Sequence, residues 1–201
     1  MYPHERSLVE DHKDDPFAII GVNSDKDREK LKPVLEKEPG DPAAVDCLVW
    51  IARNCRSGAE FDKALEVIFK NHLRSEKLDQ VCIALLYSGN ASTEERLRAI
   101  LEKSPHPRVQ GEAALRLAQH LKGRKAAESE KLLEQVIEKY GTLAAGDKTL
   151  GDQARADLFE IRNLAIGKVA PDIEGEDIEG RKFKLSDERG KVVVLDFWGN
   201  W

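Results

Sequence analysis

The chain has 201 residues, enough for one or two ordinary domains, and a formal net charge of −5. Acidic and basic residues are interleaved, and the isoelectric point near 5.7 argues against the basic face that nucleic-acid binding requires. No apolar run approaches the ~20 residues that cross a bilayer, so we expect no membrane span. The polar start, residues 1–6, lacks a signal-peptide pattern, so we expect the chain as written to be cytoplasmic or a fragment of something larger.

The first zone, residues 1–38, predicts a helix, a strand and a second helix. Residues 3–13 have helical character, with Pro3 in the first turn. The apolar run over 17–22 lies between Pro16 and Asn23 and indicates a short buried strand. A helix over 25–36 follows. This order suits part of an α/β layer.

The second zone, residues 41–166, predicts a series of short amphipathic helices joined by short turns. Asp41-Pro42 opens the first helix, Pro107 opens a later one, and a last helix runs over 150–166. Ser92 and Glu95 predict a capping box. Apolar residues recur at i, i+3, i+4 and i+7, as in Phe61, Ala64, Leu65 and Ile68. The pattern is typical of a helical array, although no strict internal period makes it more than repeat-like.

The third zone, residues 167–201, predicts extended structure. Helical spacing stops at Gly167. A short strand over 182–185 follows the turn at Glu179-Gly180, and Ser186 is placed to cap a brief helical turn. The run Lys-Val-Val-Val-Leu-Asp-Phe-Trp over 191–198 predicts a central strand covered on both faces.

Three blocks of this zone resemble a known family. They are Gly-Lys-Val-Ala-Pro-Asp at 167–172, Gly-Arg-Lys-Phe-Lys-Leu-Ser-Asp at 180–187, and Arg-Gly-Lys-Val-Val-Val-Leu-Asp-Phe-Trp-Gly-Asn-Trp at 189–201. The blocks resemble the thioredoxin-like redoxins of the alkyl-hydroperoxide-reductase and thiol-specific-antioxidant kind, and the thiol–disulfide reductases related to them. In that family the nucleophilic Cys of a Cys-x-x-Cys pair comes next after the second Trp. Because Trp201 is the last residue given, no residue is assigned that role.

The first zone resembles the segment that follows the Cys-x-x-Cys pair in the same family: residues 1–9 match its helix, 17–23 the next strand and 25–36 the next helix. The expected fold class is therefore mixed and mostly α, with a helical repeat-like array and a partial thioredoxin-like α/β element built from both chain ends. The expected domains are 1–38, 41–166 and 167–201. Three origins fit: a gene-model fragment, a true permutation, or a stop at a selenocysteine codon.

The resemblance implies roles for three residues in an intact parent. Asp196 matches the buried carboxylate that relays a proton during thiol–disulfide exchange, and Trp198 and Trp201 flank the missing thiols. A carboxylate inside an apolar strand is costly unless it has a role or a partner. The alternatives are a simple hydrogen-bonded Asp near a strand end and two packing Trp residues. A protein or small-molecule thiol or disulfide is the implied substrate, with no cofactor.

The three cysteines, Cys47, Cys55 and Cys82, form no Cys-x-x-Cys pair and lack metal-ligand spacing with any His. We expect them to be small buried residues, and we expect no metal site. Two functions remain. One is a redoxin whose helical region holds it near a protein partner. The other is a non-catalytic helical interaction module that carries redoxin remnants.

Overall fold

The computed structural model describes residues 44–55, 57–197 and 199, and the helices α3 to α9 lie in these ranges. The helix, strand and helix expected within 1–38 lie outside the described residues. The chain divides into two compact units, one up to Asp157 and one from Leu158. We call the described part of the first the helical unit and that of the second the C-terminal unit. The expected domain boundary between 166 and 167 stays a prediction.

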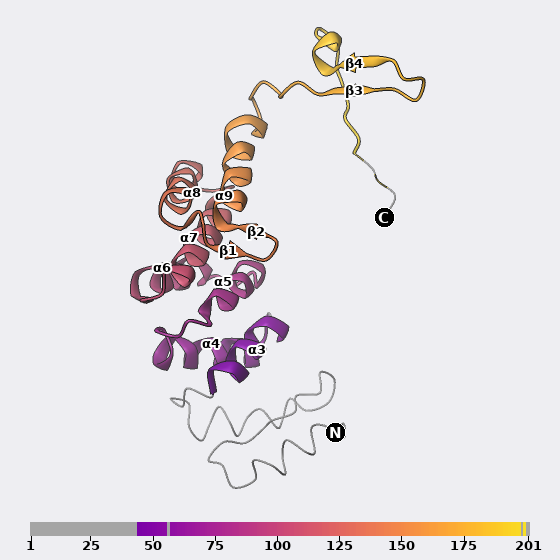
Figure 1. Ribbon diagram of the computed structural model, residues 1–201. Coiled ribbons are helices and arrows are strands. Elements are labelled where there is room, and N and C mark those ends of the chain that lie inside the picture. The colour runs from indigo at the N-terminus through magenta and orange to yellow at the C-terminus, as the bar shows by residue number, and fades with distance from the viewer. Residues whose placement is uncertain (1–43, 56, 198, 200–201) are drawn as a thin grey trace, which may run out of the picture. The chain divides into compact units, whose positions relative to one another are not determined.

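The helical unit contains the amphipathic helices that the sequence predicts, and the mostly helical fold is confirmed (Figure 1). The helices are α3 Ala44–Cys55, α4 Ala59–Asn71, α5 Leu78–Tyr87, α6 Thr93–Lys103, α7 Pro107–Leu121, α8 Ala126–Tyr140 and α9 Leu150–Phe159. Helix α3 packs on α4 and α5, whereas α7 packs on α5, α6 and α8. The description of these helices as a repeat array stays a prediction.

The core of the helical unit consists of the apolar stripes read from the sequence. In α4 the side chains of Phe61, Ala64, Leu65 and Ile68 are all buried. Helix α7 is the most enclosed, because residues 111–118 are buried without interruption. Each fully buried Leu or Ile contributes about 1.5–3 kcal/mol relative to an exposed one. The packing of these stripes therefore supplies most of the free energy that stabilises the helical unit.

A buried ion pair lies within α7. Arg116 donates from Nη2 to Oε1 of Glu112 over 2.6 Å, and both side chains are buried. One turn further along α7, Gln119 Nε2 donates to Oδ2 of Asp157 in α9 over 2.7 Å. Charges removed from water need such partners, so this chain of polar contacts ties α9 to the central helix.

The start of α6 differs from the prediction. Ser92 is the N-cap residue, but its side chain makes no capping hydrogen bond, so the predicted capping box is wrong. Instead, Ser92 Oγ donates to Asn90 Oδ1 over 2.8 Å. Asn90, two residues earlier, offers the Ser92 hydroxyl a local acceptor, and such short-range hydrogen bonds compete with the capping bond.

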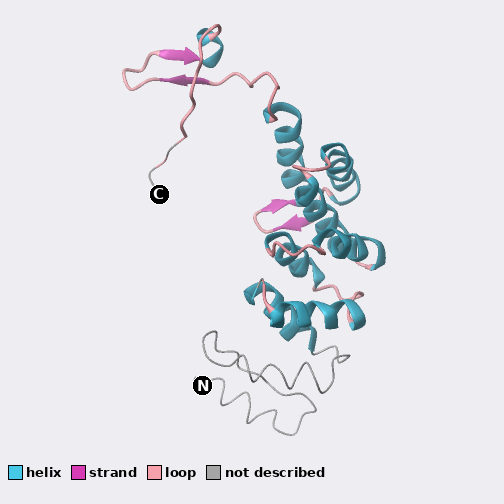
Figure 2. Ribbon diagram, turned by 180° about the vertical axis from the view of Figure 1, so that it is seen from behind, coloured by secondary structure: helices cyan, strands magenta, loops and turns pink. Residues whose placement is uncertain are grey.

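The end of the helical region also differs. Helix α9 ends at Phe159, and a π-helical turn, Glu160–Leu164, replaces the predicted continuation to 166. Asn163 Nδ2 donates to the Phe159 carbonyl over 3.0 Å, a side-chain bond that competes with the regular ladder. Before α9 lies a hairpin that the sequence analysis missed, β1 Ala144–Ala145 and β2 Lys148–Thr149 (Figure 2).

The C-terminal unit contains a second antiparallel hairpin, β3 Glu174–Glu176 and β4 Lys182–Lys184, followed by a 3₁₀ turn, Leu185–Glu188. The predicted strand and brief helical turn are thus confirmed, although Lys184 rather than Ser186 is the N-cap residue.

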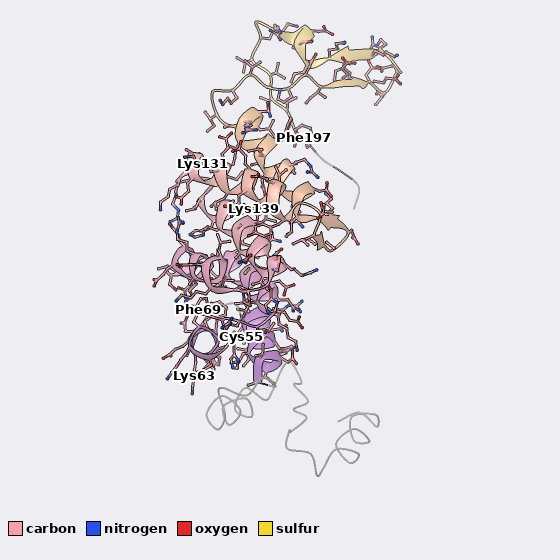
Figure 3. All side chains as sticks on the ribbon, turned by 60° about the vertical axis from the view of Figure 1, so that its left-hand side comes forward. Cys55, Lys63, Phe69, Lys131, Lys139 and Phe197 are labelled. Carbon is pink, nitrogen blue, oxygen red and sulfur yellow. The ribbon has the colours of Figure 1, made fainter. Side chains whose placement is uncertain are left out.

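The strand predicted over 191–198 is not formed within its described part, residues 191–197. Residues 192–197 have no regular structure. Val192 is 98% exposed and Phe197 is 79% exposed, and Figure 3 labels Phe197 in this run. A strand needs a neighbour to accept and donate its ladder bonds. Within the described part of the C-terminal unit, both strands already pair with each other and none lies beside this run.

Candidate functional site

The C-terminal unit carries the residues that resemble the redoxins, and its hairpin is the local frame. Glu174 pairs with Lys184, Gly175 with Phe183 and Glu176 with Lys182. The Phe183 ring lies over Gly175, where an added Cβ would meet its Cζ atom at 3.0 Å. A residue without a side chain at 175 therefore lets the Phe183 ring approach the opposite strand closely.

The hairpin turn is organised by Asp177. Its Oδ1 atom accepts hydrogen bonds from the backbone N–H groups of Glu179 and Arg181, each over 2.9 Å. These bonds, above all those with Arg181, hold the pKa of the Asp177 carboxyl below its usual range. Gly180 has a φ of +78°, the left-handed region that glycine enters without steric cost. The predicted turn at Glu179-Gly180 is therefore confirmed.

Two of the blocks that resemble the redoxins contact each other directly. Asp172, the last residue of the first block, accepts from the Ser186 backbone N–H at Oδ1 and from the Ser186 hydroxyl at Oδ2, each over 2.8 Å. The same donors, the hydroxyl first, hold the pKa of Asp172 below its usual range. The Leu185 N–H donates to the Ile173 carbonyl over 2.9 Å beside them. The motif carboxylate thus fixes the start of the hairpin to the turn after β4.

Sequence analysis missed this contact, because the two residues are 14 positions apart. The available signal was chemical. Short Asp and Ser side chains readily bond backbone groups in turns, and both lie at the ends of extended stretches.

Asp196 lies in the exposed run 192–197, and its own side chain is exposed. Trp198 and Trp201 lie outside the described residues. The roles of these three residues therefore stay predictions. The hairpin itself borders a cavity of about 360 Å³, which is lined by both strands and Asp187.

The three thiols lie in the helical unit and are free. Cys82 is buried, as predicted, whereas Cys47 and Cys55 are half-buried. Burial raises the pKa of the Cys82 thiol well above its usual value, and burial, with Asp46 nearby, raises that of Cys47. The thiolate is the nucleophilic form, so neither of these cysteines is poised for thiol–disulfide exchange.

The described residues show neither a metal-binding cluster nor a membrane-spanning helix. Among residues 44–55, 57–197 and 199, no three His, Cys, Asp or Glu side chains gather closely enough to hold a metal ion. None of the helices in the same ranges is long and apolar enough to span a membrane.

Comparison with known proteins finds relatives for short segments of this chain. Short segments are similar to thiol–disulfide oxidoreductases, which are thioredoxin-like proteins. The relatives carry the name thiol-disulfide oxidoreductase ResA. The protein from Geobacillus thermodenitrificans is 47% identical over 53 residues, which cover 26% of this chain and 30% of that protein. The protein from Geobacillus kaustophilus is 50% identical over 38 residues, covering 19% and 22%. The Bacillus subtilis protein is 44% identical over 39 residues, again covering 19% and 22%.

The chain therefore spans less than a third of the length of these relatives. No family model matches the chain, so its place in the antioxidant redoxin family is not confirmed. No solved structure matches it either.

Proposed function

We propose that this chain is part of a thioredoxin-like redoxin, a thiol–disulfide or peroxide oxidoreductase of the antioxidant type, whose catalytic domain opens with residues 167–201. The bonds from Ser186 to Asp172 carry the proposal. They join two separate blocks that were singled out because they resemble redoxins, which supports treating both blocks as parts of one domain. The short similarities to thiol-disulfide oxidoreductases support the same function and do not favour a purely non-catalytic module.

In this proposal Asp196 relays protons in the complete protein. One cysteine thiolate of a Cys-x-x-Cys pair attacks a substrate disulfide and expels the first substrate thiolate. Asp196 then takes the proton of the second cysteine, which attacks the mixed disulfide, and passes that proton to the second departing thiolate. The redoxin pair is oxidised to a disulfide, and the substrate disulfide gains two electrons. Trp198 and Trp201 shape the surface beside the thiols.

We expect the exposed run 192–197 to become a buried strand when the rest of its domain is present. Its β-branched and aromatic residues suit a buried strand, yet they face solvent in the C-terminal unit. In the permuted origin of the chain, residues 17–22 would supply the neighbouring parallel strand, which gives a partial thioredoxin-like element from both chain ends. The half-exposed Phe183, beside the hairpin cavity, provides a further apolar surface against which the remaining domain packs.

The test begins with the nucleotide sequence on both sides of the codons for this chain. A Cys or selenocysteine codon after Trp201, followed by codons for Gly-Pro-Cys, supports the proposal. The complete protein is then assayed for disulfide reduction. We expect Asp196→Asn to slow turnover by about 100-fold, the lower end of general acid–base effects, whereas Glu179→Gln, a carboxylate change at an exposed turn residue of the same unit, leaves the rate unchanged.

The 201-residue polypeptide contains no Cys-x-x-Cys pair, and we expect no dithiol turnover from it. Disulfide reduction that survives simultaneous replacement of Cys47, Cys55 and Cys82 would contradict the mechanism. So would a genomic sequence that continues into unrelated codons on both sides.

A further inference from the structure

The helical unit has a groove that the redox proposal does not use. It has a volume of about 240 Å³ and is formed by α3 and α5, with Arg53 from the first helix and Gln80, Ile83, Ala84 and Tyr87 from the second. Ala84 is buried, whereas Ile83 is 39% exposed and Tyr87 64% exposed. The groove thus has a small-residue floor and two apolar side chains that stand at its edge.

The charge at this groove is positive. Arg53 is exposed, and its Nη1 atom donates to Gln80 Oε1 over 2.8 Å. An amide oxygen satisfies the donor without neutralising the guanidinium charge. The nearby acids on the same helices already hold other cations: Asp46 binds Lys77 over 2.5 Å and Asp79 binds Arg108 over 2.9 Å. Arg53 is therefore the groove residue that offers charge to an anionic ligand.

The size of the groove limits what it can hold. A cofactor or drug-sized ligand needs a pocket of about 300–1,000 Å³, which is larger than the 240 Å³ found here. A cavity of about 150 Å³ already accepts a benzene-sized ring. The groove therefore suits one large apolar side chain rather than a whole small molecule.

We propose that this groove binds a peptide segment of a partner protein in which a large apolar residue lies next to an acidic one. The apolar side chain enters the groove between Ile83 and Tyr87, and the neighbouring carboxylate binds the Arg53 guanidinium. Apolar burial gives the contact its anchor, and the charge pair fixes the orientation of the segment. The inference rests on the helical unit alone and stands whether or not the redox proposal holds.

The experiment selects binders from a phage-displayed library of random heptapeptides on the full 201-residue protein. The enriched peptides are then synthesised with a fluorescent label and titrated by anisotropy. We expect the enriched sequences to share an Asp or Glu beside Phe, Tyr, Trp, Leu or Ile. Raising the ionic strength weakens their binding, because an exposed charge pair is screened by salt.

Variants then test the groove itself. We expect Arg53→Glu and Tyr87→Ala each to weaken binding by about fivefold or more, through charge reversal and loss of the anchor surface. Arg53→Gln removes the charge but retains hydrogen-bonding capacity towards Gln80, and weakens binding less than Arg53→Glu. The matched control is Lys139→Glu, the same charge change at an exposed position of α8 (Figure 3), which leaves affinity unchanged.

Circular dichroism confirms that each variant keeps its helices before its affinity is interpreted. Three outcomes overturn the proposal: no peptide is enriched, the enriched peptides show no acidic preference, or Arg53→Glu binds them as tightly as Lys139→Glu does.

Discussion

In the helical unit the large apolar side chains fill the interior, whereas in the C-terminal unit they lie at the surface. Leu117 of α7 is 0% exposed, while Val192 is 98% exposed. The C-terminal unit owes its order to hydrogen bonds made by short polar side chains, chiefly Asp172 and Asp177. A hairpin can therefore be held locally by turn chemistry, but burial of its apolar residues needs further layers of structure.

The sharpest test of this difference removes apolar groups from each unit. We expect Leu117→Ala to lower the free energy of unfolding by about 2–5 kcal/mol, because it leaves a cavity in a packed core. Val192→Ala should change it by less than about 0.5 kcal/mol, as for an exposed side chain. Urea denaturation followed by circular dichroism measures both. A large loss for Val192→Ala would mean that the run 192–197 is buried in solution.

A second test adds volume to the core. A Cβ atom on Gly111 would lie 2.7 Å from Leu150 Cδ1 and 2.8 Å from Tyr140 Cβ. We therefore expect Gly111→Ala to destabilise the protein by about 1–3 kcal/mol through overpacking between α7, α8 and the start of α9. The same denaturation assay applies.

The matched control is Gly123→Ala, since a Cβ atom there meets nothing within 4 Å. With less backbone freedom in the unfolded chain, this variant should be neutral or stabilised by up to about 1 kcal/mol. Equal effects of the two substitutions would show that α7 is less tightly enclosed than the structure has it.

The same difference explains what the sequence could predict. Helical stripes such as Phe61 and Leu65 repeat within a few turns, so periodicity alone located their helices and their buried faces. The turn at Gly180 was equally local. Ser92 shows the limit, because a single neighbour, Asn90, redirected its hydroxyl away from the cap. Local rules fail where two short-range partners compete for one side chain.

Non-local pairing was harder to predict. The composition of residues 191–198 favours a strand, but a strand also depends on the segment beside it, which composition does not specify. The hairpin of β1 and β2 was missed for a related reason, since its alanines have low strand propensity and its register follows from contacts such as Leu150 N–H to the Leu143 carbonyl. For the site, Asp196 was predicted from its motif and stays a prediction, whereas the contact between Asp172 and Ser186 emerged only from the structure.

The smallest expected effect concerns that contact and its dependence on pH. The folded state lowers the pKa of Asp172 below its ordinary 3.8, because the charged carboxylate accepts two hydrogen bonds from Ser186. A lowered folded pKa contributes stability that is fully present above the ordinary value and is lost as the pH falls through the folded one. We expect hydrogen exchange of the Ser186 amide to be slow near neutral pH, after correction for intrinsic exchange. Its protection should decrease only below about pH 3.8.

Substitution separates this carboxylate from its neighbours. Asp172→Asn keeps the shape but turns a charged acceptor into a weaker neutral one, so the Ser186 amide should lose protection already at neutral pH. Glu179→Gln is the control, because its exposed pair with Arg181 lies at the other end of the hairpin and should leave Ser186 unaffected. If Asp172→Asn left the protection intact, the two motif blocks would be held together by the strand pairing of β3 and β4 alone, and the motif carboxylate would have no part in ordering the hairpin.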